Sequence, residues 1–195
     1  MEDLPIQLLE VVTGTAVEAV LRARLPVEVV VATEALWKPF RQAIPGAEHS
    51  HWDWALKTGR LVLPGTRIMG VECRGVIEGM MMVFERGYYS RLQPAVGQPL
   101  VYVDFLETAP WNLRTFSPGA RFRRAGVRLM AAAARLSESL GYEGRVGLRS
   151  LPQSEDFYVR ACRMSALGPD RGYDRLWYFE WAADAACLFA EGAGR

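Results

Sequence analysis

The stretch "GARFRRAGVRLM", residues 119–130, runs directly into "AAAARLSESLG", residues 131–141. The second half has high helix propensity, and Gly141 is placed to end the helix. The arginines before it lie against the positive end of the helix dipole, an arrangement that an anion or nearby carboxylates would relieve. The stretch therefore predicts a long helix entered through a cationic loop, which either binds a phosphate or is a solvated helix start.

Composition limits the class of protein to which this loop belongs. The chain has 195 residues, half of them hydrophobic, and a formal net charge of +1. It is long enough to bury a sizeable core as one domain, and its charge gives no reason to expect nucleic acid or an anionic membrane as partner. Cys73, Cys162 and Cys187 lie far apart, without the spacing of a disulfide scaffold or a zinc ribbon. With no secretion signal and no apolar run of bilayer length, we expect a cytoplasmic protein.

Strands surround the loop on both sides in the sequence. "TRIMGVEC" (66–73) and "VIEGMMMVFE" (76–85) are separated by Arg74 and Gly75, which predicts a tight hairpin. "PLVYVDFLET" (99–108) alternates apolar and polar residues and predicts a further strand, ended by Pro110. "RVGLR" (145–149) follows the long helix, so a crossover makes it parallel to 102–108.

The two ends of the chain complete the predicted order. An extra helix is predicted at residues 6–24, and the β-branched run 27–32 predicts a buried strand. Two helices are predicted next, one at 34–44 capped by Thr33 and one at 51–57 capped by Ser50 and ended by Gly59. Ser154 is placed to cap a short helix at 155–161, before a closing hairpin at 164–168 and 175–181. The fold class is α/β, with a mixed, mostly antiparallel sheet flanked by helices. We expect one domain over 1–195, with a helical extension at 1–25, a core at 27–181 and a helix or tail at 182–195.

This order and the arginine-rich loop resemble the GNAT superfamily of acetyl-CoA-dependent N-acyltransferases over residues 27–181. The family loop reads Q/R-x-x-G-x-G/A, and anchoring the helix on Leu129 aligns Arg121, Arg124 and Gly126 with its conserved positions. One glycine is thus an arginine, which either obstructs the pyrophosphate or contacts it through the guanidinium. The resemblance implies acetyl-CoA as cosubstrate, bound by Arg121, Phe122, Arg123, Arg124, Ala125, Gly126 and Val127.

A second point of resemblance is "SLPQSEDFYVRACRM", residues 150–164, which looks like the fourth helix of the family. There a tyrosine protonates the departing coenzyme A thiolate, and Tyr158 matches it; the alternative is an ordinary packed aromatic. Arg163 stands where the family has a glycine. The segments 107–112 and 141–158 also look like a group of uncharacterised bacterial GNAT-like proteins, in which a histidine commonly replaces Arg149.

The acceptor side of such a fold suggests further candidates. Glu107, at the end of its strand, is the carboxylate best placed to act as a base, although many family members use water. Glu72 and Glu78 are candidates for holding a cationic acceptor. His51 and Trp54 are candidates for lining an acceptor pocket, with core packing as the alternative.

The paired histidines and the last strand complete the candidate list. His49, His51 and Asp53 invite a metal interpretation, but too few ligands accompany them, and we predict no metal. The aromatic strand at 175–181 favours a buried sheet or a protein interface, hence a possible homodimer. The resemblance implies an N-acetyltransferase in which an amine attacks acetyl-CoA directly. The alternative is a GNAT-fold binding or assembly module that no longer uses coenzyme A.

Overall fold

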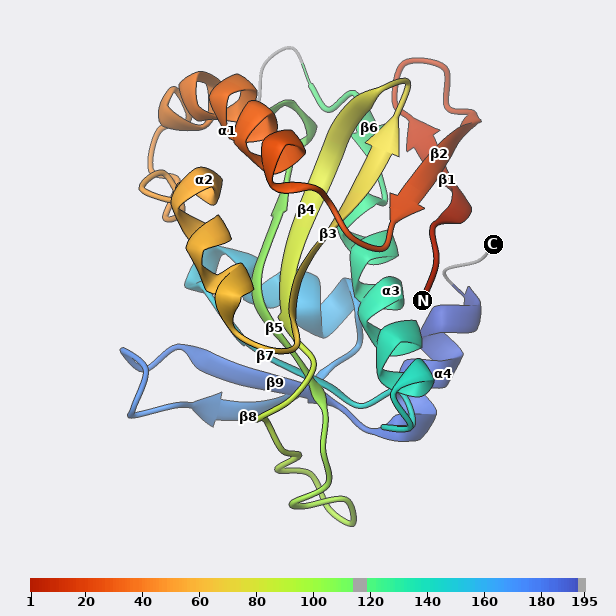
Figure 1. The fold of residues 1–195 in the computed structure, drawn as a ribbon, viewed down its shortest axis with the longest axis vertical. Helices are drawn as coiled ribbons and strands as arrows, with labels where there is room; N and C mark the ends of the chain where they lie inside the picture. Colours follow the sequence, from red (N-terminus) through yellow and green to blue (C-terminus); the bar gives the residue numbers. More distant parts are fainter. Residues whose placement is uncertain (114–118, 193–195) are drawn as a thin grey trace. The chain divides into compact units, whose positions relative to one another are not determined.

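The structure, a computed structural model, describes residues 1–113 and 119–192 (Figure 1). The strands are β1 (Leu4–Glu10), β2 (Ala16–Arg22), β3 (Thr66–Cys73), β4 (Val76–Phe84), β5 (Val101–Thr108), β6 (Phe122–Arg123), β7 (Val146–Ser150), β8 (Ser165–Pro169) and β9 (Trp177–Trp181). The α-helices are α1 (Val27–Gln42), α2 (Trp54–Lys57), α3 (Ala125–Ser139) and α4 (Ala183–Gly192). Short 3-10 segments lie at Thr58–Val62, Pro110–Asn112 and Pro152–Ser154, and a π-helical turn at Phe157–Ala161.

The strands form a nine-stranded sheet in the order β6-β1-β2-β3-β4-β5-β7-β9-β8. Strands β5 and β7 pair in parallel, whereas β1–β2, β2–β3, β7–β9 and β8–β9 pair antiparallel. Arg74 and Gly75 both have positive φ, 52° and 76°, as a two-residue hairpin turn requires. The predicted α/β class, the mostly antiparallel sheet and the parallel crossover through α3 are confirmed.

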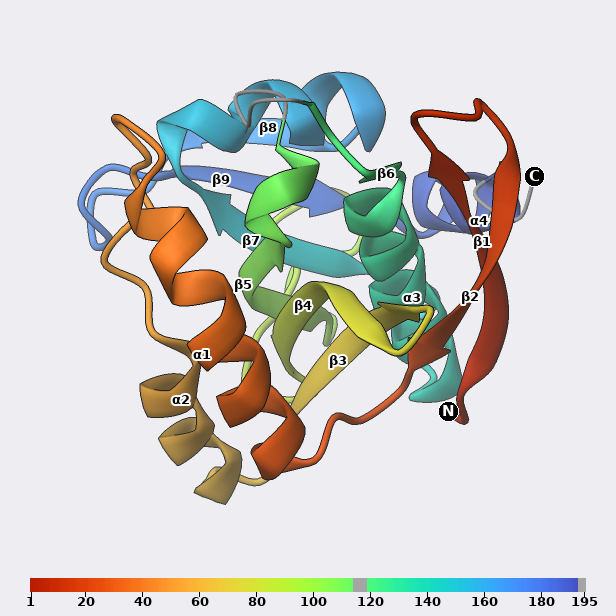
Figure 2. The same ribbon diagram turned by 90° about the horizontal axis from the view of Figure 1, so that it is seen from above.

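The predicted N-terminal helix at 6–24 is wrong, because this segment is the antiparallel hairpin β1–β2 (Figure 2, red). Leu4 pairs with Leu21 and Leu9 with Ala16. The turn falls at Thr13 and Gly14, the two residues that weaken a helix here, and Gly14 has φ +66°. Pairing with β3 and burial of Leu8 and Leu21 outweigh the local helix propensity of this segment.

The predicted strand at 27–32 is also wrong, since these residues form the first turns of α1. Pro26 occupies the N-cap, and its carbonyl accepts the amides of Val29 and Val30. A short apolar run cannot be assigned to strand or helix by periodicity alone. The buried residues of α1 decide the matter, because they recur at helical spacing: Val30, Thr33, Glu34, Trp37 and Arg41.

Four residues predicted to begin or end helices, three N-caps and one C-terminal glycine, have other roles in the structure. The Thr33 hydroxyl donates to the Val29 carbonyl inside α1 (2.8 Å) rather than capping a helix. Asp53, not Ser50, caps α2, because its carboxylate accepts the Leu56 amide at 3.0 Å. The chain continues through Gly59 in a 3-10 segment, so Gly59 does not end a helix. Ser154 is the last residue of another 3-10 segment rather than a helix N-cap.

The described chain divides into two compact units. One comprises residues 2–81 and 106–129, and contains α1, α2 and the hairpins β1–β2 and β3–β4 up to residue 81. The other comprises residue 1, 82–105 and 130–195, with β7, β8, β9 and α4. Helix α4 lies in the segment 182–195, for which a helix or a tail is predicted, and residues 193–195 lie outside the described residues. The expectation of a single domain stays a prediction.

Burial places the core of each unit. In residues 2–81, Ile68, Met69 and Trp37 are fully buried, and α1 lies beside α2 in both views (Figure 2). In the other unit, Leu100, Tyr102 and Tyr178 form a buried cluster. None of the described helices is long and apolar enough to cross a bilayer.

Candidate functional site

The cationic loop enters α3 through a left-handed residue. Strand β6 pairs with β1, and the Arg124 carbonyl accepts the amide of Arg128 at 2.9 Å, the first bond of the helix. Arg124 has φ 78°, a conformation that favours glycine. The position aligned with the missing glycine therefore keeps the backbone of a glycine.

The start of α3 offers donors that suit an anion. Helical amides at 125–127 precede the first intrahelical bond, so the helix leaves them without an acceptor of its own. The side chains of Arg121, Arg123 and Arg124 are exposed. Arg128 differs, because it is only 6% exposed and donates from Nε to the Gln7 carbonyl at 2.8 Å. Three of the four arginines and the first-turn amides thus form a donor set that fits a phosphate group.

Two residues just before the loop, which the sequence analysis left unassigned, tie it to β4. Asn112 donates from Nδ2 to Glu78 Oε2 (2.7 Å) and accepts the Phe122 amide at Oδ1 (2.8 Å). Trp111 donates from Nε1 to the same Glu78 oxygen (2.8 Å), and the Arg121 guanidinium lies 5.6 Å from its ring centroid. No sequence motif marks the two bonds to Glu78, since their partners are more than thirty residues apart in the sequence.

Tyr158 lies in the π-helical turn Phe157–Ala161 and is 6% exposed. Its ring centroid is 5.1 Å from that of Phe157 and 5.8 Å from that of Phe179. Burial raises the pKa of the phenol well above its usual range, so the hydroxyl keeps its proton at neutral pH. Arg163, after this turn, has φ 57° and thus also keeps a backbone suited to glycine.

The parallel strands β5 and β7 pair over only three residues each. Their register runs from Val101 opposite Val146 to Val103 opposite Leu148, and then stops, although both strands continue. Beyond this point Arg149 and Ser150 pair with β9 alone among the described strands. Among the described residues, the parallel pairing of β5 with β7 thus ends at Val103 and Leu148.

Solved structures with this arrangement of strands and helices identify the fold. A comparison of the sequence with family models found no match, and one with curated proteins found none either. The structure superposes on a bacterial toxin (TM-score 0.58, 12% identity, 97% of this chain and 95% of that one) and on the GNAT domain of S. lividans PAT (0.54, 12%, 92% and 96%). It also superposes on Mycobacterium smegmatis RimJ in complex with CoA-disulfide (0.51, 12%, 98% and 94%).

The chain has the GNAT fold. In this frame β2 leads into the two helices α1 and α2, and β5, α3 and β7 form the parallel crossover. The hairpin partner β1 and the two-residue strand β6 extend the sheet at the opposite end from β8. The GNAT resemblance drawn from the loop is thereby confirmed at the level of the fold.

Within the GNAT fold, Glu107 belongs to a buried charge cluster. It is 4% exposed; Oε1 accepts Arg41 Nε (2.7 Å) and Oε2 accepts Trp54 Nε1 (2.6 Å). Arg41 also donates to both oxygens of Glu34 and to the Trp52 carbonyl. Burial raises the pKa of Glu107, and the Arg41 charge opposes that rise. Both carboxylate oxygens are occupied by donors, and the role of Glu107 as a base stays a prediction.

The other acceptor candidates are dispersed. Trp54 is fully buried and holds Glu107, whereas His51 is exposed. Glu72 pairs with Arg22 at 2.8 Å, and Glu78 holds Asn112 and Trp111. In the described part of the chain, no three His, Cys, Asp or Glu side chains gather as metal ligands would. The acceptor role of His51 and Trp54 stays a prediction.

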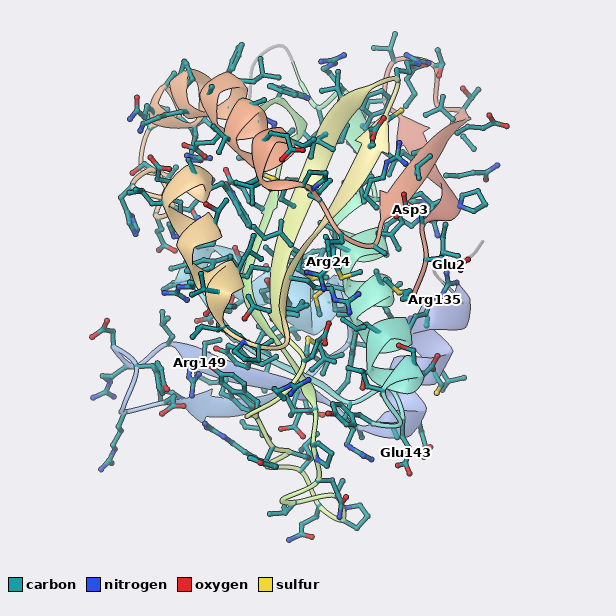
Figure 3. The ribbon with its side chains drawn as sticks, in the orientation of Figure 1. Glu2, Asp3, Arg24, Arg135, Glu143 and Arg149 are labelled. Atoms are coloured by element: carbon teal, nitrogen blue, oxygen red, sulfur yellow. The ribbon has the colours of Figure 1, made fainter. Side chains whose placement is uncertain are left out.

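Arg149 has a structural environment of its own on β7 (Figure 3). It donates from Nε and Nη2 to one Asp170 oxygen (3.0 and 2.8 Å) and from Nη1 to the Tyr102 hydroxyl (2.9 Å). Its guanidinium lies 3.3 Å from the Tyr173 ring centroid. Arg149 thus cross-links β5, β7 and the β8–β9 turn.

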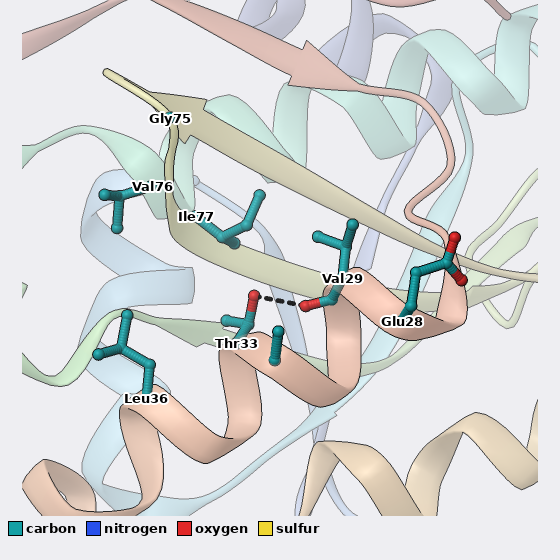
Figure 4. Close-up of a pocket in the computed structure, with 8 residues that line it drawn as sticks. Glu28, Val29, Thr33, Leu36, Gly75, Val76 and Ile77 are labelled. Atoms are coloured by element: carbon teal, nitrogen blue, oxygen red, sulfur yellow. Dashed lines mark hydrogen bonds between the residues drawn. The ribbon is translucent and has the colours of Figure 1, made fainter.

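A shallow apolar groove lies between α1 and the start of β4 (Figure 4). Its volume is about 310 Å³. The lining residues are Glu28, Val29, Ala32, Thr33, Leu36, Gly75, Val76 and Ile77. Leu36, which lines this groove, is 47% exposed, and Val27 and Val31 of α1 are exposed outside it. Neither His51 nor Trp54 lines this groove.

Proposed function

We propose that the chain is an acetyl-CoA-dependent N-acetyltransferase that acts on an amine. The observation that carries the proposal is the left-handed backbone at Arg124 directly before α3, in a chain with the GNAT fold. The Arg124 carbonyl accepts the first bond of α3, and the first-turn amides that lack an acceptor within the helix are donors that suit a phosphate group. A protein with the same fold at 12% identity, RimJ, is described in complex with CoA-disulfide.

Under this proposal the residues divide into two roles. Residues 121–127 bind the pyrophosphate through backbone amides and through the guanidinium groups of Arg121, Arg123 and Arg124. When bound, acetyl-CoA supplies an acetyl group already activated as a thioester. Tyr158 donates its proton to the departing sulfur, a role suited to a phenol whose raised pKa keeps it protonated.

The proton of the acceptor amine requires a base or water. Glu107 is the proposed base, and to accept a proton one of its oxygens must be released by Trp54 or Arg41. A bridging water avoids this requirement. Comparing the turnover of Glu107→Gln with that of wild type distinguishes Glu107 from a bridging water as the base. Turnover persists in the variant if water accepts the proton and is lost if Glu107 does.

Thermal unfolding with and without acetyl-CoA tests the function most directly. A ligand that binds only the folded state raises its stability, by about 2.7 kcal/mol at a hundredfold excess over Kd. We expect a higher Tm with millimolar acetyl-CoA and with free coenzyme A, but not with ATP at equal concentration. An unchanged Tm with both coenzyme A forms would contradict the proposal, and an amine screen should follow a positive result.

A second candidate, an assembly module with the same fold, is favoured by the outer face of α1. Val27 and Val31 expose apolar surface beside the groove and Leu36 exposes apolar surface within it, and a second copy of the chain would cover all three. The expected result is a homodimer in multi-angle light scattering that Leu36→Glu dissociates and Leu188→Glu, at another exposed leucine, does not. A monomer would remove this candidate. Cys73, Cys162 and Cys187 form no disulfide in the described part of the chain, which suits the reducing cytoplasm that we propose as the location of the protein.

A further inference from the structure

The start of the loop is held by one buried carboxylate on β4. Glu78 is fully buried, and its Oε2 accepts both Trp111 Nε1 and Asn112 Nδ2. These two donors fix the orientation of the Asn112 amide, so that Oδ1 faces the Phe122 amide and accepts it at 2.8 Å. The buried carboxyl group of Glu78 is thus connected through the Asn112 side chain to the backbone of the cationic loop at Phe122.

The next residue of β4 supports the other end of the loop. A Cβ built on Gly79 would lie 3.0 Å from Leu129 Cδ1 and 3.5 Å from Ala125 Cβ. The backbone of β4 therefore packs closely against the first turn of α3. Glu78 and Gly79, adjacent in sequence, set both the entry of the loop at Phe122 and its exit at Ala125.

Stability alone is a poor reason for a carboxylate at this position. Its partners Trp111 and Asn112 are neutral, and among the described residues Oε1 finds no hydrogen-bond partner. Burial raises the pKa of Glu78, and the hydrogen bonds from Trp111 and Asn112, together with the charge of Arg121, oppose that rise only in part. A neutral side chain would fill the space at lower cost in desolvation.

We propose that Glu78 is a positioning residue for the phosphate-binding loop: through Asn112 it holds the backbone at Phe122, while Gly79 seats the start of α3. The inference rests on the proposed function, because it assigns the loop to acetyl-CoA. It predicts that the Glu78 acceptor, rather than its charge, is what the loop requires. Glu78→Gln retains an acceptor oxygen and Glu78→Met does not.

Amide hydrogen exchange and acetyl-CoA titration on the full chain test this. In Glu78→Met and Asn112→Ala, we expect the Phe122 amide to exchange at least about tenfold faster and the Kd for acetyl-CoA to rise about tenfold, because the hydrogen bond from the Phe122 amide to Asn112 is lost or weakened. Glu78→Gln should keep both within about twofold of wild type. Glu180→Met removes another fully buried carboxylate, which accepts the Arg91 amide. It should leave both the exchange rate of the Phe122 amide and the Kd for acetyl-CoA unchanged.

The possible failures are distinguishable. The positioning role is overturned if folded Glu78→Met exchanges its Phe122 amide at the wild-type rate, or if exchange becomes equally faster throughout the protein. If Glu78→Met does not fold, Asn112→Ala provides the same test. If wild type itself binds no acetyl-CoA, the proposed function fails. The exchange at Phe122 then still decides whether Glu78 holds the loop.

Discussion

Arg124 and Arg163 share a backbone conformation that few residues other than glycine adopt, with φ of 78° and 57°. Both positions align with glycines of the GNAT superfamily. A left-handed conformation costs an L-residue with a side chain roughly 1–2 kcal/mol. The main chain therefore has a conformation that favours glycine at two places where the sequence has arginine.

Restoring either glycine should stabilise the protein. For Arg124→Gly and Arg163→Gly we expect a gain of about 0.5–1 kcal/mol in the free energy of unfolding, because relief of strain exceeds the extra chain entropy of glycine. Urea denaturation measures this. Arg123→Gly is the matched control, since Arg123 lies in β6 without positive φ, and should lose stability. A lower free energy of unfolding in all three variants would contradict backbone strain at Arg124 and Arg163.

The same Arg124→Gly variant decides what the arginine does for the ligand. Tighter acetyl-CoA binding in calorimetry would mean that the side chain obstructs the pyrophosphate. Weaker binding would mean that its guanidinium contacts phosphate, a bond that glycine cannot replace.

Replacing Tyr158 tests the proton donor. We expect Tyr158→Phe to fold and to bind acetyl-CoA as wild type does, but to turn over roughly a hundredfold more slowly, the loss of one general acid. Because burial raises the pKa of the phenol, the wild-type rate should not decline through Tyr158 ionisation as pH rises to about 10. Tyr173→Phe, at an exposed tyrosine, is the control. Equal rates for Tyr158→Phe and wild type would exclude the role.

Gly79 should not tolerate a methyl group. Gly79→Ala places Cβ 3.0 Å from Leu129 in a fully buried site, and we expect a loss of about 1 kcal/mol or more in stability. Gly59→Ala provides the comparison, because a Cβ there meets nothing within 4 Å and φ is ordinary. Equal urea midpoints for the two variants would show that β4 and α3 are less closely packed than described.

Glu78 should make stability depend on pH in a defined direction. Because the pKa of Glu78 is raised in the folded state above its ordinary value of 4.5, the folded protein binds this proton more tightly than the unfolded chain. The contribution of Glu78 is thus most favourable below pH 4.5 and is lost as pH rises through the folded pKa. The stability of Glu78→Gln relative to wild type should increase between pH 4 and pH 8, as measured by urea denaturation. A constant difference would contradict the raised pKa.

The sequence predicted the elements whose signals are local. The hairpin at Arg74 and Gly75, the helix after residue 124 and the parallel strand at Val146 follow from turn chemistry, propensity and the crossover rule. The segments 6–24 and 27–32 failed for the opposite reason. Their state depends on which partner they pack against, and the same apolar residues serve a strand as well as a helix.

The candidate site divides in the same way. The loop at 121–126 could be located from its arginines and from the helix that follows. The hydrogen bonds by which Asn112 and Glu78 hold this loop could not be predicted, because they depend on where β4 passes the loop in the folded chain. Nor does sequence indicate that Glu107 pairs with Arg41, sixty-six residues away.

The N-terminal hairpin has a consequence for the order of folding. Strand β6 pairs with β1, at Leu9 and Arg123, and the Val11 amide donates to the Arg121 carbonyl. These partners are separated by roughly 110 residues, and contacts so distant in sequence close late. On a ribosome the first strand must wait for most of the chain to be synthesised before its edge is covered. In pulse-labelling exchange during refolding, the Val11 amide should gain protection after the β3–β4 hairpin, and a deletion of residues 1–10 should leave the loop at Arg121 unprotected.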